Sequence, residues 1–171
     1  MPESGSVQLI KSGAPVKDLP AAGAAFVRRL IKTYEPSLIV REAPLPPRFN
    51  GFSNTKTFVS QHFLHGAVIA IAGFYGVDDV DADVTTWRKF FCGRSTANPA
   101  SKRGVMKSSR QKTEDRTANK AMVLHRAKLL GYLPIGCEDT DRADACGIWE
   151  FGCGTYGRAA PAPLVMYEAC A

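Results

Sequence analysis

The alternation of helix-like and strand-like segments is the feature that most constrains the fold of this 171-residue chain. Apolar residues at Val27, Leu30, Ile31 and Tyr34 recur three and four positions apart, which predicts a helix with one buried stripe. A continuous apolar run follows at 37–42 and ends in charged side chains. That pattern is typical of a central strand whose last side chain emerges at the carboxyl edge of a sheet.

The rest of the chain continues this alternation. Further helices are expected over about 54–75, 85–91, 114–130 and 141–152, and further strands over 5–11 and 77–84. We expect Thr85 or Thr86 to cap the short helix and Gly93 to end it. The pattern predicts an α/β fold with helices on a mainly parallel sheet. Three strands are few for a central sheet, so we expect strands of the intact fold to be missing at the amino end.

Length and composition favour one soluble domain over residues 1–171, because the chain has a mass of 18.5 kDa and is 45% hydrophobic. The apolar run 67–75 is shorter than a bilayer span, and the first residues do not resemble a signal peptide. We therefore expect a cytoplasmic protein with no membrane partner. The five cysteines form no CxxC pair, which favours reduced thiols. A zinc site of Cys137, Cys146, Cys153 and a histidine is the alternative, although this spacing matches no recurring ligand pattern.

Positive charge is concentrated in the middle of the chain. The net charge is +6, and the segment from Arg88 to Lys128 holds 12 basic residues against Glu114 and Asp115. Such a segment attracts a phosphate backbone and releases its counterions. A solvated basic surface is the alternative, so charge alone favours a nucleic-acid partner by a small margin.

Three carboxylates carry the strongest chemical signal. Asp141 and Asp144 are three residues apart, so a helix places them on one face, and Glu42 ends the predicted central strand. Together they can hold two hard divalent cations, which activate water and stabilise the oxygens of a phosphodiester displacement. The structural alternative for the helical pair is that Thr140 or Asp141 caps the helix and that first-turn acids favour its dipole.

Three blocks in the same order resemble the RuvC Holliday-junction resolvases, particularly their phage and prophage members. They are LIVREAP (38–44), TTWRKFFCG (85–93) and DRADA (141–145), within a similarity that runs from about 4 to 151. The resemblance implies an RNase H-like mixed sheet flanked by helices. It also implies a crossover junction endonuclease that uses Mg²⁺ or Mn²⁺ and acts on branched DNA as a homodimer.

The resemblance also implies roles for individual residues. Glu42, Asp141 and Asp144 would be catalytic ligands of two metal ions, while a loop aromatic, Phe49 or Phe52, would insert at the junction centre. The alternative for both aromatics is simple packing. The candidate DNA-binding residues are Arg48, Phe49, Phe52, Arg88, Lys89, Lys102, Arg103 and Lys107.

One family residue has no counterpart here. The family's first catalytic aspartate lies on an amino-terminal strand, ahead of the segment that 4–9 resembles. Glu3, Asp18 and Glu35 do not fit that position. We therefore expect the strand that carries this aspartate to be missing, with weakened metal binding as the consequence.

Three functions remain open at this point. The first is a metal-dependent endonuclease of branched DNA, and the second is a catalytically inactive DNA-binding or assembly homologue that keeps the basic surface. The third is another RNase H-like enzyme, such as an exonuclease or a transposase fragment. The implied homodimer has candidate contacts in Phe58, Phe63, Phe74 and Tyr75, which can equally belong to the core.

Overall fold

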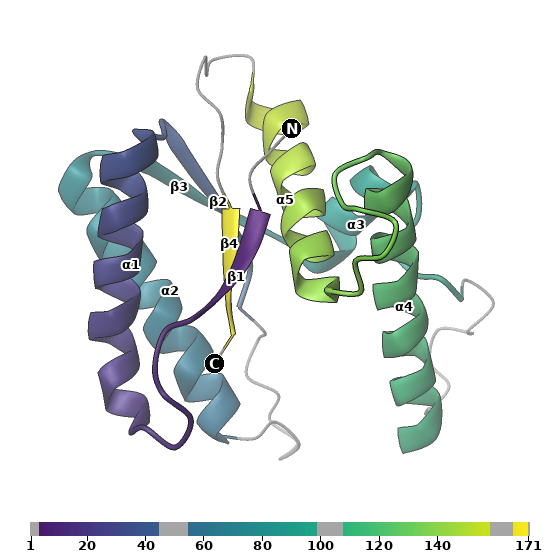
Figure 1. Ribbon diagram of the computed structural model, residues 1–171, viewed down its shortest axis with the longest axis horizontal. Coiled ribbons are helices and arrows are strands. Elements are labelled where there is room, and N and C mark those ends of the chain that lie inside the picture. Colours follow the sequence, from purple (N-terminus) through teal and green to yellow (C-terminus); the bar gives the residue numbers. More distant parts are fainter. Residues whose placement is uncertain (1–3, 45–54, 99–107, 158–165, 171) are drawn as a thin grey trace.

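The computed structural model describes residues 4–44, 55–98, 108–157 and 166–170 (Figure 1). The elements in chain order are β1 (Ser4–Gln8), the 3-10 turn η1 (Val16–Asp18), α1 (Leu19–Tyr34), β2 (Leu38–Glu42), α2 (Thr55–Tyr75), β3 (Asp78–Ala82), α3 (Val84–Cys92), α4 (Ser109–Leu129), α5 (Thr140–Tyr156) and β4 (Met166–Cys170). The predicted α/β class is confirmed.

Two parallel strand pairs form the sheet structure of the described residues. β2 pairs with β3, with Leu38 opposite Asp78 and Glu42 opposite Ala82. β1 pairs with β4, a strand that the sequence pattern did not predict. In Figure 1 the strands lie between two groups of helices, with α1 and α2 on one side and α3, α4 and α5 on the other.

The main core fills the space between β2, β3 and the second group of helices. Trp87 and Phe91 of α3 and Val123 of α4 are almost fully buried there. α5 approaches α3 closely at Gly147, where an added Cβ would lie 2.8 Å from the Trp87 ring. Because this contact leaves no room for a methyl group, Gly147 allows α5 to pack directly on the indole.

We expect Gly147→Ala to destabilise the protein by about 1–2 kcal/mol, because overpacking a buried aromatic contact outweighs the helix propensity of alanine. Urea unfolding measures the change. Gly66→Ala in α2 is the matched control, since an added Cβ there meets nothing within 4 Å, and it should leave stability unchanged or raise it. Equal effects at the two positions would contradict the packing argument.

The cap of α3 differs from the sequence prediction. Asp83 is the N-cap, since its carboxylate accepts from the backbone N–H groups of Thr85 at 2.9 Å and Thr86 at 3.1 Å. The prediction that Thr85 or Thr86 caps the helix was wrong because the helix begins at Val84, one residue earlier than expected. Gly93 ends the helix in a left-handed conformation with φ 75°, as predicted.

Helix α2 presents an apolar surface outside the core. Of the four predicted interface residues, Phe63 and Phe74 are 39% and 79% exposed, whereas Phe58 and Tyr75 are partly buried. Ile69 on the same helix is 47% exposed. By length and composition alone, α2 is long and apolar enough to cross a membrane, although the apolar run 67–75 within it is shorter than a bilayer span. A single helix of this kind is weak evidence for a membrane span.

Candidate active site

Glu42, the last residue of β2, lies where three helices meet the sheet. Burial raises the pKa of its carboxyl group, and the positive charge of Arg88 opposes that shift. The Trp87 indole and Lys120 also lower this pKa, and Asp141 raises it. These influences come from α3, α4 and α5, so the carboxylate at the end of β2 faces groups from all three helices.

Asp144 is the most buried of the three candidate carboxylates, with 6% of its surface exposed. Burial, followed by repulsion from Glu42, raises its pKa to about 6, while Lys120 and Arg88 act in the opposite direction. Its Oδ1 atom is buried and has no hydrogen-bond partner among the described residues. A buried carboxylate with an unused acceptor beside a second carboxylate is costly unless a cation compensates it.

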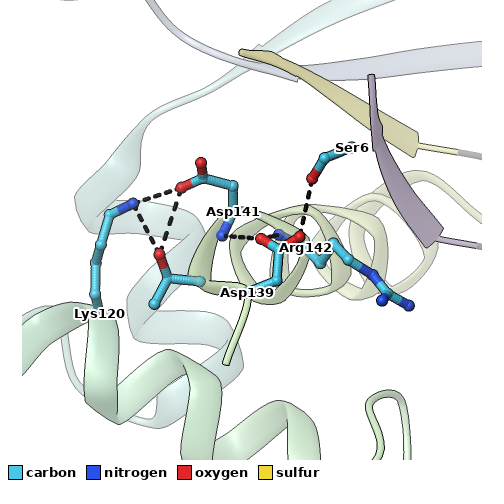
Figure 2. A network of polar contacts seen from close by, with 6 residues as sticks. Ser6, Lys120, Asp139, Asp141 and Arg142 are labelled. Atoms are coloured by element: carbon cyan, nitrogen blue, oxygen red, sulfur yellow. Dashed lines mark hydrogen bonds and ion pairs between the residues drawn. The ribbon is translucent and has the colours of Figure 1, made fainter. Parts of the chain in front are cut away.

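The start of α5 is fixed by Asp139. Its Oδ1 accepts from the backbone N–H groups of Asp141 at 3.0 Å and Arg142 at 3.1 Å, and its Oδ2 accepts from the Ser6 hydroxyl at 3.0 Å (Figure 2). Asp139, rather than Thr140 or Asp141, is therefore the N-cap, which corrects the structural alternative considered from the sequence. The Asp141 side chain is not needed as a cap, and Ser6 ties β1 to this helix end.

Lys120 of α4 contacts the same helix end. Its Nζ lies 2.5 Å from Asp141 Oδ1 and donates to Thr140 Oγ1 at 3.1 Å. Figure 2 shows the Arg142 side chain pointing away from this contact. Sequence reasoning counted Lys120 within the basic segment but did not single it out.

Arg88 supplies the second positive charge. It follows the fully buried Trp87 on α3, and its guanidinium carbon lies 5.2 Å from the centre of the Trp87 ring. The ring nitrogen of Trp87 and the Nε of Arg88 are buried and form no hydrogen bond of normal geometry with the described residues. Arg88 was predicted to contact DNA, and the structure places its charge beside Glu42 and Asp144.

The donor types suit a hard divalent cation, since all three candidate ligands are carboxylates. The unused Oδ1 of Asp144 offers one ligand atom. However, no three Asp, Glu, His or Cys side chains in the described part of the chain converge as a metal cluster. Asp141 is held by Lys120 instead. The chemistry of the donors therefore fits a metal ion, while their arrangement is not that of a closed metal cage.

The remaining predicted site residues are distributed as follows. Lys89 is exposed on α3. Six predicted DNA contacts lie outside the described residues, namely Arg48, Phe49, Phe52, Lys102, Arg103 and Lys107. The described cysteines are free thiols: Cys92, Cys137, Cys146 and Cys153.

The fold, Glu42 at the end of β2 and the buried Asp144 of α5 define a class of α/β protein with a carboxylate site at the carboxyl edge of a parallel strand pair. No protein-family model and no curated protein matches the sequence. Among solved structures, the chain is similar to the RuvC structure of Thermus thermophilus, with a TM-score of 0.53 and 18% sequence identity. The match covers 90% of this chain and 77% of that chain. The protein therefore has a RuvC-like fold.

Proposed function

We propose that this protein is a divalent-metal-dependent endonuclease that cuts Holliday junctions or other branched DNA. Glu42, Asp141 and Asp144 are the proposed ligands of Mg²⁺ or Mn²⁺. The observation that carries the proposal is the pair of Glu42, which is half-buried, and Asp144, which is buried and keeps an unused acceptor oxygen, with the charges of Arg88 and Lys120 nearby. Outside a metal site, two interacting carboxylates that are withdrawn from water oppose folding, so their presence needs a functional reason.

Each group has a role in this proposal. Bound metal ions would activate water and stabilise the entering and leaving oxygens of the phosphodiester. Arg88 and Lys120 bring positive charge to the carboxylates and can attract a phosphate group to the same place. Lys89, exposed on α3, and the basic segment that follows it would contact the DNA backbone without sequence preference.

An inactive DNA-binding or assembly homologue is the second candidate, and one observation favours it. No three-carboxylate metal cluster is formed by the described residues. This alternative retains the basic surface and predicts binding of DNA without cleavage.

Incubation of a labelled four-way junction with Mn²⁺ or Mg²⁺ tests the proposal. The endonuclease reading predicts nicks that EDTA abolishes. The inactive homologue predicts that the junction is bound, with affinity that falls steeply as salt rises, and is never cut. Salt-dependent binding without nicks in either metal would therefore favour the second candidate.

The proposal includes a homodimer in the cytoplasm, with the apolar surface of α2 facing a second copy. Phe63 and Phe74 are exposed on this helix, and an isologous contact would bury both side chains in each of the two copies. We expect Phe74→Glu to shift the protein to a monomer without unfolding it. Sedimentation velocity measures the mass.

Ile135→Glu is the matched control for this prediction, because Ile135 is 88% exposed and lies outside α2. It should leave the dimer intact. A wild-type protein that is monomeric at high concentration would contradict the dimer. The apolar surface would instead be a membrane contact if the wild type needs detergent to stay in solution and binds lipid vesicles. Phe74→Glu should then abolish the vesicle binding.

A further inference from the structure

One ammonium group interacts with every candidate metal ligand. Lys120 Nζ lies 2.5 Å from Asp141 Oδ1, and its charge also lowers the pKa values of Glu42 and Asp144. Lys120 comes from α4, whereas Asp141 begins α5, so the contact joins two helices across the site (Figure 2). This position against Asp141 is the one that a divalent cation bound to that carboxylate would take.

The two cations of the site differ in their freedom to move. The Nε of Arg88 is buried, and its guanidinium lies over the Trp87 ring at 5.2 Å, so the aromatic ring holds it in place. The Lys120 side chain is 30% exposed and ends in a point charge on a flexible stem. Lys120 is therefore the cation that can leave the carboxylates, while Arg88 stays.

The ion pair between Lys120 and Asp141 explains why the carboxylates do not form a metal cluster. Lys120 holds Asp141, whereas Asp144 keeps an unused Oδ1 in the interior. A divalent ion that recruited Asp141 would meet the ammonium at short range and be repelled by it. The ammonium, once displaced, would need another anion, and a DNA phosphate at the site supplies one.

We propose that Lys120 is an internal counter-ion that takes the place of a divalent cation on Asp141, and that its transfer to a DNA phosphate couples metal binding to DNA binding. The inference rests on the proposed function. It implies that metal ions bind weakly to the free protein and more tightly to the protein–DNA complex. By linkage, metal ions strengthen DNA binding by the same factor.

Calorimetric titration of the full chain with Ca²⁺, an oxygen-seeking cation, tests the coupling with and without a four-way junction. We expect Lys120→Met to bind Ca²⁺ about tenfold more tightly than the wild type in the absence of DNA. The junction should tighten binding to the wild type by a similar factor and leave Lys120→Met unchanged. Circular dichroism checks that each variant is folded.

Two further variants separate charge from structure. Lys120→Arg keeps the positive charge and should retain the weak Ca²⁺ binding of the wild type. Lys112→Met removes an exposed lysine from the same helix, away from the carboxylates, and should leave Ca²⁺ binding in the absence of DNA unchanged. Ca²⁺ binding to folded Lys120→Met that is equal to or weaker than that of the wild type would overturn the inference.

The failure of the inference differs from that of the proposed function. If Asp144→Asn abolishes Ca²⁺ binding but Lys120→Met leaves it unchanged, the metal site stands and the counter-ion role is wrong. If the wild type binds no Ca²⁺ with or without the junction, the proposed metal-dependent function fails and the inference fails with it.

Discussion

Asp144→Asn should stabilise the metal-free protein by about 3 kcal/mol above pH 6, although it removes a proposed catalytic group. The folded-state pKa of Asp144 is raised from 3.8 to about 6, mainly by burial, and each unit corresponds to about 1.4 kcal/mol. The folded protein therefore holds this proton more tightly than the unfolded chain. The ionised carboxylate opposes folding, and asparagine removes that charge.

The sign of the pH dependence follows from the raised pKa. Below about pH 4, Asp144 is protonated in both the folded and the unfolded state and costs nothing. As the pH rises from about 4 to about 6, the unfolded chain ionises first and the wild type loses stability. Above about pH 6 the cost is complete. Urea unfolding from pH 4 to pH 8 in EDTA should show that the advantage of Asp144→Asn grows over this interval.

Two results would contradict this expectation. One is an advantage of Asp144→Asn that is the same at pH 4 and pH 8, which would assign the effect to packing. The other is a destabilised variant at pH 8. Asp79→Asn is a suitable control, since Asp79 accepts from Arg41 in an ion pair of 2.6 Å on the β2–β3 pair. Loss of this ion pair in Asp79→Asn should destabilise the protein, in contrast to Asp144→Asn.

Glu42→Gln should reduce metal-dependent cleavage by at least about 10³-fold, because loss of a metal ligand removes several kcal/mol of transition-state stabilisation. Glutamine preserves the shape of the side chain, so the fold should remain. Initial nicking rates of a junction at saturating Mn²⁺ measure the effect. Glu150→Gln is the matched control, since Glu150 lies on α5 but is not among the groups that mainly shift the pKa values of Glu42 and Asp144. Similar losses in both variants would contradict the assignment.

Local patterns predicted the elements whose periodicity is set by burial in the core. The stripe of Val27 and Ile31 identified α1, and the apolar run that ends in Glu42 identified β2. The N-caps of α3 and α5 lie one to three residues before the predicted ones, because the Asp83 and Asp139 carboxylates accept the first backbone N–H groups of these helices. The periodicity does not fix where each helix begins.

Long-range contacts account for the features that sequence reasoning did not find. β4 is a strand of five residues that pairs with β1 from the other end of the chain, so no local turn predicts their pairing. Lys120 is one of many basic residues in its segment, and its role depends on how α4 packs against α5. Glu42 and Asp144 were predicted as one site, and the structure brings their charges into direct electrostatic interaction.

The rate of cleavage of a four-way junction relative to a linear duplex of the same sequence tests the central claim most directly. With the wild type in Mn²⁺, we predict nicks in the junction, none in the duplex under the same conditions, and none with Glu42→Gln. Nicking by Glu42→Gln at the wild-type rate, or equal cutting of both substrates, would contradict the account of this site as a branched-DNA endonuclease.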